Sequence, residues 1–129
     1  MQEKEFKKKI LIMDDEEMIG EIACQMLQYL GADAFWVADG AEAIAEYGKQ
    51  KEAGHAYSAI IMDLTIPGGM GGQEAIAEIL TIDPMAKAFV SSGYANDPIM
   101  QNYKDYGFAG VIAKPFDIAS VQQILGTLL

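Results

Sequence analysis

The fold is decided by the stretch Ala59-Ile60-Ile61-Met62-Asp63-Leu64-Thr65-Ile66-Pro67-Gly68-Gly69-Met70-Gly71-Gly72. An unbroken apolar run ends here in a single carboxylate, and a loop rich in proline and glycine follows at once. Short apolar runs bounded by turn residues are typical of strands that are buried on both faces. Asp63 therefore lies at the carboxyl end of a central strand, which is the edge where open α/β sheets bind ligands.

Further apolar runs and helical patterns flank this strand. Strands are predicted over residues 9–13, 34–38, 58–63, 87–91 and 110–113. Apolar spacing and capping residues predict helices over 18–30, 41–50, 73–80, 98–106 and 118–128. Strands that alternate with helices indicate a parallel sheet covered on both faces, an α/β fold. Right-handed crossovers leave few topologies, and the flavodoxin-like strand order 2-1-3-4-5 is the natural one at this length.

The helical patterns also predict which side chains face the core. In the first helix the inward set includes Met18 and Ile22, and in the second it includes Ala41 and Ala45. Cys24 lies within the first pattern and has no partner for an internal disulfide, so we interpret it as a small buried apolar side chain.

Length and charge narrow the class of protein. The 129 residues, 51% of them hydrophobic, suffice for one domain with an ordinary core, which we assign to residues 9–129 after a charged, frayed segment 1–8. Nine Lys and Arg against 19 Asp and Glu give a formal net charge of -10, which argues against direct nucleic-acid binding because such binding relies on basic residues. No apolar run approaches the ~18 residues of a membrane span and no signal peptide opens the chain. We expect a cytoplasmic protein with no membrane contact.

Polar residues follow four of the predicted strands. Asp14-Asp15 comes after the first strand, Asp63 ends the third, Ser91-Ser92 ends the fourth and Lys114 follows the fifth. Parallel strands point the same way, so these residues are expected to gather at one edge of the sheet. Each has an ordinary interpretation on its own, as a helix cap, a turn residue, a strand end or a solvated lysine. Their joint placement favours a functional site.

The chemistry of this set indicates phosphoryl transfer. Three neighbouring carboxylates repel one another unless a cation joins them, and an all-oxygen site favours a hard cation such as Mg²⁺. In-line phosphoryl transfer needs mainly positioning and charge stabilisation, and a carboxylate such as Asp63 can accept the group as an acyl phosphate. Lys114 offers a positive charge and a serine hydroxyl a hydrogen bond to the phosphoryl oxygens.

These motifs resemble the receiver domain of two-component response regulators. The resemblance rests on Asp14-Asp15, on Met62-Asp63-Leu64 before a Pro-Gly loop, on Ser92-Gly93 and on Lys114-Pro115-Phe116, in this order and spacing. It covers the chain from about Lys8 to Leu129.

The resemblance implies a role for each acidic residue. Asp63 is then the phosphoacceptor, Asp15 a direct Mg²⁺ ligand and Asp14 a ligand mainly through water. The backbone carbonyl of Thr65 completes the protein ligands of the metal.

The resemblance also assigns the switch. Ser92 is then the switch hydroxyl and Lys114 the lysine that contacts phosphate, with a cis Lys114–Pro115 bond as is usual in the family. The family often has an aromatic residue three positions before this lysine, where the present chain has Val111. Tyr94 is a candidate for a related role.

Partners follow from the same resemblance. The phosphoryl group comes from a histidine kinase or a histidine phosphotransfer domain, and the domain catalyses only its own phosphorylation and dephosphorylation, so we do not class it as an enzyme. In the family, the fourth helix, fifth strand and fifth helix form the surface that changes. A downstream effector protein or domain and a phosphorylation-dependent dimer are two further partners that the resemblance allows.

The glycine loop allows other interpretations. No Gly-Lys-Ser/Thr follows it, which argues against a nucleotide-binding loop, and its glycines are explained by turns that need positive φ. A phosphatase of the haloacid dehalogenase type would carry a second Asp where this chain has Thr65. A receiver-like interaction domain that works without phosphorylation is a further alternative. The loop is one residue longer than the commonest form and is similar to that of receivers fused to hybrid sensor kinases.

Overall fold

A five-stranded, all-parallel sheet forms the centre of the molecule in the computed structural model, which describes residues 8–94 and 96–128. The strands are β1 (Lys9–Met13), β2 (Asp33–Val37), β3 (Ala59–Asp63), β4 (Ala88–Ser92) and β5 (Gly110–Ala113). Their spatial order is β2-β1-β3-β4-β5, so the predicted topology is confirmed.

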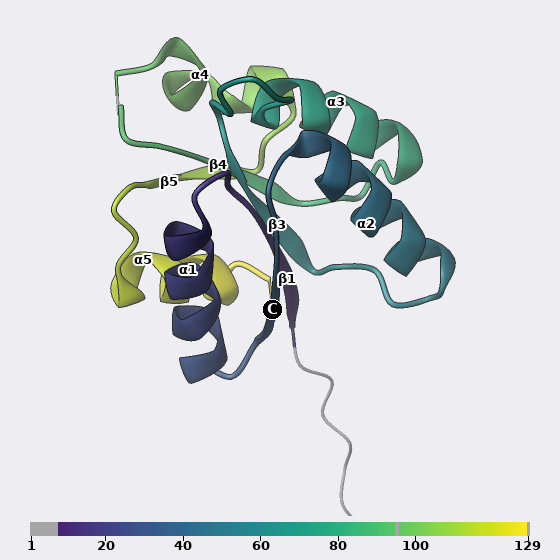
Figure 1. Ribbon diagram of the computed structural model, residues 1–129, viewed down its shortest axis with the longest axis horizontal. Coiled ribbons are helices and arrows are strands. Elements are labelled where there is room, and N and C mark those ends of the chain that lie inside the picture. Colours follow the sequence, from purple (N-terminus) through teal and green to yellow (C-terminus); the bar gives the residue numbers. More distant parts are fainter. Residues whose placement is uncertain (1–7, 95, 129) are drawn as a thin grey trace, which may run out of the picture.

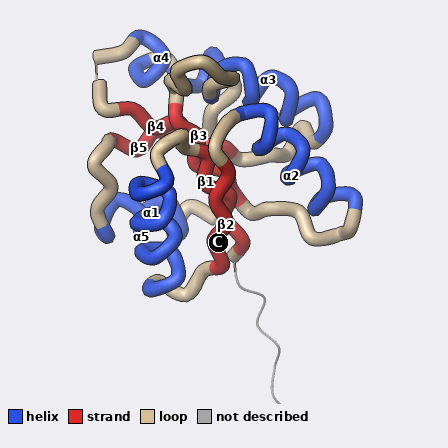
Figure 2. The backbone as a smooth tube through the Cα atoms, viewed as in Figure 1, coloured by secondary structure: helices blue, strands red, loops and turns tan. Residues whose placement is uncertain are grey.

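Helices cover both faces of the sheet and make a three-layered α/β fold (Figure 1). The helices are α1 (Glu17–Tyr29), α2 (Gly40–Glu52), α3 (Gly72–Ile82), α4 (Pro98–Gln101) and α5 (Ile118–Gly126), with a 3-10 helix η1 (Tyr103–Tyr106) after α4. Helices α1 and α5 pack on one face, and α2 and α3 lie together on the other (Figure 2). This is the flavodoxin-like arrangement that the sequence predicted.

The central strand β3 is buried along its whole length, as its apolar run predicted. Side chains alternate between the faces of a strand, so Ile60 and Met62 contribute to the core under α2 and α3, whereas Ala59 and Ile61 contribute to the core under α1 and α5. The two apolar cores fix the register of β3. Asp63 is therefore held where this strand ends.

The predicted inward faces of α1 and α2 are wrong in part. In α1, Met18 and Ile22 are exposed, because the stripe that meets the sheet is centred on Gly20 and Leu27. In α2, Ala41 and Ala45 are exposed, and the buried positions Ala43 and Tyr47 are each two residues further along. Alanine buries little surface, so it does not decide the orientation of a helix as a large side chain such as Tyr47 does.

The predicted fourth helix over 98–106 is also wrong, because it is broken at Asn102. The Asn102 amide Nδ2 donates to the carbonyl of Pro98 (3.0 Å), the same oxygen that accepts the Asn102 backbone N–H (2.9 Å). Asn side chains compete in this way with helical hydrogen bonding. Asn102 leaves helical geometry (φ -118°, ψ 39°), and the chain continues as the 3-10 helix η1. Asp97 caps α4 by accepting the Ile99 N–H, and Asp117 caps α5 by accepting the Ser120 N–H.

Lys8, Cys24 and His55 lie outside the strands of the sheet. The charged segment 1–8 lies outside the described residues except for Lys8, whose Nζ donates to the Leu128 carbonyl (2.9 Å). Cys24 packs against the core beside α5, and burial raises the pKa of its thiol. His55 is exposed in the loop before β3. Within the described residues, none of the helices combines the length and the apolar character that crossing a membrane requires.

The buried hydrogen bond between Tyr47 and Asp83 is expected to stabilise the folded protein. Tyr47 Oη donates to Asp83 Oδ2 (2.6 Å), and this hydrogen bond is the largest cause that holds the pKa of Asp83 below its ordinary value. A lowered pKa in the folded state stabilises the protein above the unfolded pKa, about 3.9, and this contribution is lost as the pH falls through the folded pKa. Asp83→Asn retains an acceptor but loses the charge, so we expect it to lower the free energy of unfolding by about 1 kcal/mol near pH 7.

This effect can be measured by urea unfolding at about pH 7 and at about pH 3. The proteins to compare are the parent, Asp83→Asn and the exposed control Asp105→Asn. The deficit of Asp83→Asn is expected to shrink in acid, while Asp105→Asn stays near the parent. A deficit of equal size at both pH values contradicts the assignment.

Candidate functional site

The structure brings the predicted site residues together at the carboxyl edge of the sheet. Parallel pairing aligns Met13 with Met62, so Asp14 and Asp15 emerge beside Asp63. The opposite neighbour of β3 is β4, where Asp63 aligns with Ser91, and β4 in turn aligns Ser92 with the residue before Lys114. The register of the sheet thus positions every residue of the predicted set.

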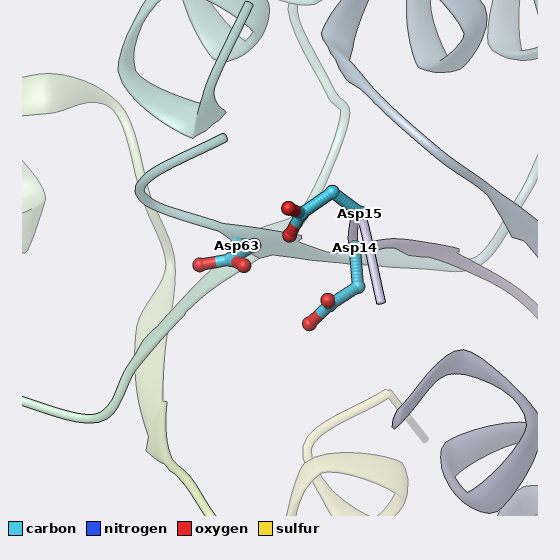
Figure 3. A group of neighbouring side chains, drawn as sticks. All are labelled: Asp14, Asp15 and Asp63. Atoms are coloured by element: carbon cyan, nitrogen blue, oxygen red, sulfur yellow. The ribbon is translucent and has the colours of Figure 1, made fainter. Parts of the chain in front are cut away.

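Three carboxylates form the centre of this edge (Figure 3). Asp14, Asp15 and Asp63 each offer one oxygen, and these oxygens all lie within 4.8 Å of one another. Asp14 and Asp63 are buried, whereas Asp15 is exposed. A cavity of about 510 Å³ opens over the cluster, and its lining includes Asp15, Asp63, Thr65, Ser92 and Lys114. The carboxylates therefore have access to solvent from one side.

Lys114 supplies the positive charge of the site. Its Nζ makes ion pairs with Asp14 Oδ2 (2.6 Å) and Asp63 Oδ2 (3.0 Å). Burial alone lowers the pKa of this ammonium, but the hydrogen bonds and charges of the two carboxylates outweigh burial and raise it. Burial raises the pKa of the Asp63 carboxyl, against the opposing effect of Lys114. The Lys114–Pro115 peptide is cis, as predicted.

Hydrogen bonds fix both the side chain and the backbone of Asp14. Its Oδ1 accepts the Glu16 N–H (2.9 Å), and its backbone N–H donates to the Val37 carbonyl (3.1 Å). The indole Nε1–H of Trp36 donates to the Asp14 carbonyl (2.8 Å). Trp36 is not among the site residues that the sequence motifs predict. The one available sign was that the chain contains a single tryptophan, in the strand next to the acidic pair.

The loop after β3 closes tightly over Asp63. The Thr65 N–H donates to Asp63 Oδ1 (3.3 Å), so the residue predicted to offer its carbonyl lies directly beside the acceptor. The explanation of the loop glycines by positive φ is wrong for all but Gly68 (φ +75°). Gly71 is needed for close approach instead, because a Cβ there would lie 2.4 Å from the Leu64 carbonyl oxygen.

The two serines at the end of β4 differ in their surroundings. Ser92 lines the cavity, and its Oγ accepts the Tyr94 N–H (3.0 Å). Ser91 is buried, and its Oγ has no hydrogen-bond partner in the part of the chain that the structure describes. Tyr94 also lines the cavity and is 79% exposed, whereas Val111 lies on the edge strand β5 and is 41% exposed. The geometry therefore favours Ser92 over Ser91 as the functional hydroxyl.

The donor set fits a hard divalent cation. The three carboxylate oxygens lie within 4.8 Å of one another, and two of the residues are buried while one is exposed. This arrangement matches the preference of Mg²⁺ for oxygen ligands and for water that it keeps when bound. Lys114 neutralises only part of their charge, so the cluster keeps a net negative charge for a cation to balance.

Comparison with known proteins identifies the family. The profile of the response regulator receiver domain matches residues 10–126. This chain belongs to the response regulator receiver family. Sporulation initiation phosphotransferase F of Bacillus subtilis is 28% identical over 114 residues, which are 88% of this chain and 87% of that protein. The chemotaxis protein CheY of Thermotoga maritima is 30% identical over 119 residues, or 92% of this chain and 94% of that protein.

A solved receiver domain has the same fold. The receiver domain of a sensor histidine kinase from Pseudomonas aeruginosa superposes with a TM-score of 0.81 at 27% identity, covering 95% of this chain and 98% of that one. That structure holds a magnesium ion coordinated in its active site cleft. The receiver fold predicted from the sequence motifs is thus confirmed for this chain.

The contrast between the serines generates one prediction. Ser91→Ala removes a buried hydroxyl without a partner, so we expect it to raise the free energy of unfolding by about 1 kcal/mol. Ser92→Ala is the matched control, since it removes an acceptor that is in use and is not expected to stabilise. Urea unfolding of both variants tests the difference, and a loss of stability in Ser91→Ala would show that its hydroxyl has a partner.

Removal of the Lys114 charge is expected to change both the melting temperature and the Mg²⁺ affinity of the protein. Lys114→Met leaves two buried carboxylates unpaired, so the metal-free protein is expected to melt at a lower temperature. The same change removes a cation that repels Mg²⁺. Repulsion of unit charges ~4 Å apart is about 1 to 4 kcal/mol, which corresponds to Mg²⁺ binding at least about fivefold tighter. Melting curves over a range of Mg²⁺ concentrations, with the exposed Lys104→Met as control, report both effects; unchanged Mg²⁺ affinity contradicts the competition.

Proposed function

We propose that this receiver domain accepts a phosphoryl group on Asp63 in a Mg²⁺-dependent reaction. The observation that carries the proposal is the acidic cluster itself: three carboxylates within 4.8 Å, partly neutralised by one lysine, under a cavity open to solvent. A buried carboxylate with no metal or phosphoryl chemistry to perform would more simply be replaced by an apolar residue.

Each residue has a part in the transfer. Asp14, Asp15 and Asp63 and the Thr65 carbonyl would hold Mg²⁺, which when bound neutralises charge on the phosphoryl oxygens. An Asp63 oxygen attacks phosphorus, the bond from phosphorus to the donor nitrogen breaks, and the donor imidazole keeps the bonding electron pair. Lys114 moves its ammonium from the carboxylate to a phosphoryl oxygen, and Ser92 donates its hydroxyl to another.

The donor would be a phosphohistidine on a histidine kinase or a phosphotransfer protein. The only histidine of this chain, His55, lies in an exposed loop between α2 and β3, so the donor is taken to be another domain or protein. The Bacillus relative is named as a phosphotransferase, which is consistent with such an exchange. On this proposal the domain works in the cytoplasm and catalyses only its own phosphorylation and dephosphorylation, and it is not an enzyme with an external product.

The phosphoryl group would switch a protein-binding surface. Ser92 and Lys114 bracket the end of the β4–β5 pair, so drawing them toward Asp63 pulls on both strands. An open cavity of about 350 Å³ lies on the far side of β5, between η1 and α5, and Val111 is part of its lining. A surface that changes shape there would bias binding of an effector or of a second copy.

Intact mass spectrometry after incubation with acetyl phosphate and Mg²⁺ tests the proposal. We expect the parent to gain the mass of one phosphoryl group, and EDTA or Asp63→Asn to abolish the gain. The exposed Asp105→Asn is the control for nonspecific modification and should be labelled like the parent. Absence of the adduct, or an adduct that persists in Asp63→Asn, would favour a receiver that binds partners without phosphorylation.

A further inference from the structure

The single tryptophan of the chain contacts the backbone of the acidic pair. Trp36 belongs to β2, which is an edge strand of the sheet, and the strand register aligns it with Ile12 of β1. From this position its indole reaches past the end of β1, and Nε1–H donates to the Asp14 carbonyl (2.8 Å). Trp36 is half-buried, and it is not among the residues that line the cavity over the carboxylates.

A glycine in α1 provides the space for the indole. A Cβ at Gly20 would lie 2.3 Å from Trp36 Cδ1 and 2.6 Å from Trp36 Nε1. The indole therefore lies directly against the helix backbone. Glycine inside a helix costs roughly 0.5 to 1 kcal/mol relative to alanine. This cost is explained if the position of the indole matters more than the stability of the helix.

The contact constrains Asp15 through the peptide bond. The Asp14 carbonyl belongs to the planar unit that joins Asp14 to Asp15, so fixing its oxygen restricts the orientation of the whole plane, including the Cα of Asp15. The other side of Asp14 is tied to the same strand, because its N–H donates to the Val37 carbonyl (3.1 Å). The two hydrogen bonds to residues of β2 thus fix the position of the Asp15 Cα.

Asp15 depends on this constraint more than its neighbours do. Asp14 and Asp63 are buried, and both make ion pairs with Lys114. The Asp15 carboxylate is exposed, and no hydrogen bond or ion pair orients it within the described part of the chain. Its place in the cluster is therefore determined by its backbone.

We propose that Trp36 is a positioning residue for the metal site: its indole N–H fixes the Asp14–Asp15 peptide so that the Asp15 carboxylate faces Asp63. The inference rests on the proposed Mg²⁺ site. Groups that orient metal ligands without touching the metal typically change its affinity 10- to 100-fold when they are removed. Because Trp36 acts through the backbone, we expect an effect of about tenfold, at the lower end of this range.

Trp36→Phe tests the inference, because it keeps an aromatic ring and removes the N–H donor. Tyr57→Phe is the matched control: it also removes one hydrogen bond, from Tyr57 Oη to Glu46 (2.6 Å), but at the amino end of β3, the opposite edge of the sheet. Melting curves followed by circular dichroism in EDTA, and then over a series of MgCl₂ concentrations, give the metal-free stability and the Mg²⁺ dissociation constant of each protein. Both variants should melt a few degrees lower without metal, and only Trp36→Phe should bind Mg²⁺ about tenfold more weakly.

Gly20→Ala provides a second test that keeps the tryptophan. Alanine favours the helix, but its Cβ displaces the indole, so a red shift of the Trp36 emission is expected together with weaker Mg²⁺ binding. Emission that shifts while Mg²⁺ affinity stays at the parent value overturns the inference, as does parental Mg²⁺ affinity in Trp36→Phe. If the parent itself does not bind Mg²⁺, the proposed function fails first and this inference fails with it.

Discussion

The ammonium of Lys114 lies between two buried carboxylates, and the functional edge of the sheet depends on that contact. Asp14 and Asp63 come from different strands and would repel each other in a medium less polar than water. Their shared partner comes from a third strand. The site therefore exists only when β1, β3 and the end of β5 are in register, and the same apolar cores that hold the sheet together also hold its charges in place.

Around this ion pair the protein differentiates three chemically identical side chains. Asp63 is fixed by Lys114 and by the loop that closes on Thr65, and Asp14 by hydrogen bonds on its side chain and its backbone. Asp15 alone faces solvent. Burial, pairing and exposure thus give three carboxylates of the same chemical type three different environments, which match the roles of acceptor, anchored ligand and accessible ligand that we propose for Asp63, Asp14 and Asp15.

Much of this could be predicted from the sequence, because strand ends are marked by residue type. The run before Asp63 gave the central strand, and the parallel topology then placed Asp14, Ser92 and Lys114 beside it. Features that arise from packing were missed. The orientation of α2 is determined by the ring of Tyr47 and its contact with Asp83, and the break at Asn102 by a side-chain hydrogen bond that apolar spacing does not report. Trp36 was overlooked because its partner is a backbone carbonyl, which every residue has.

The break in the helix at Asn102 affects how a structural change at the carboxyl edge of the sheet can reach the surface around β5. Among the described residues of the segment 97–102, only Gln101 and Asn102 donate their backbone N–H groups to described carbonyls four residues earlier. Backbone stretches with so few ladder bonds open at lower free energy than strands and long helices. The stretch 98–106 lies between Ser92 and β5 along the chain, so a segment with few helical hydrogen bonds joins the cavity-lining Ser92 to the edge strand. If Asp63 accepts a phosphoryl group as proposed, this sparsely hydrogen-bonded segment offers a route by which the change at the site reaches the surface around Val111.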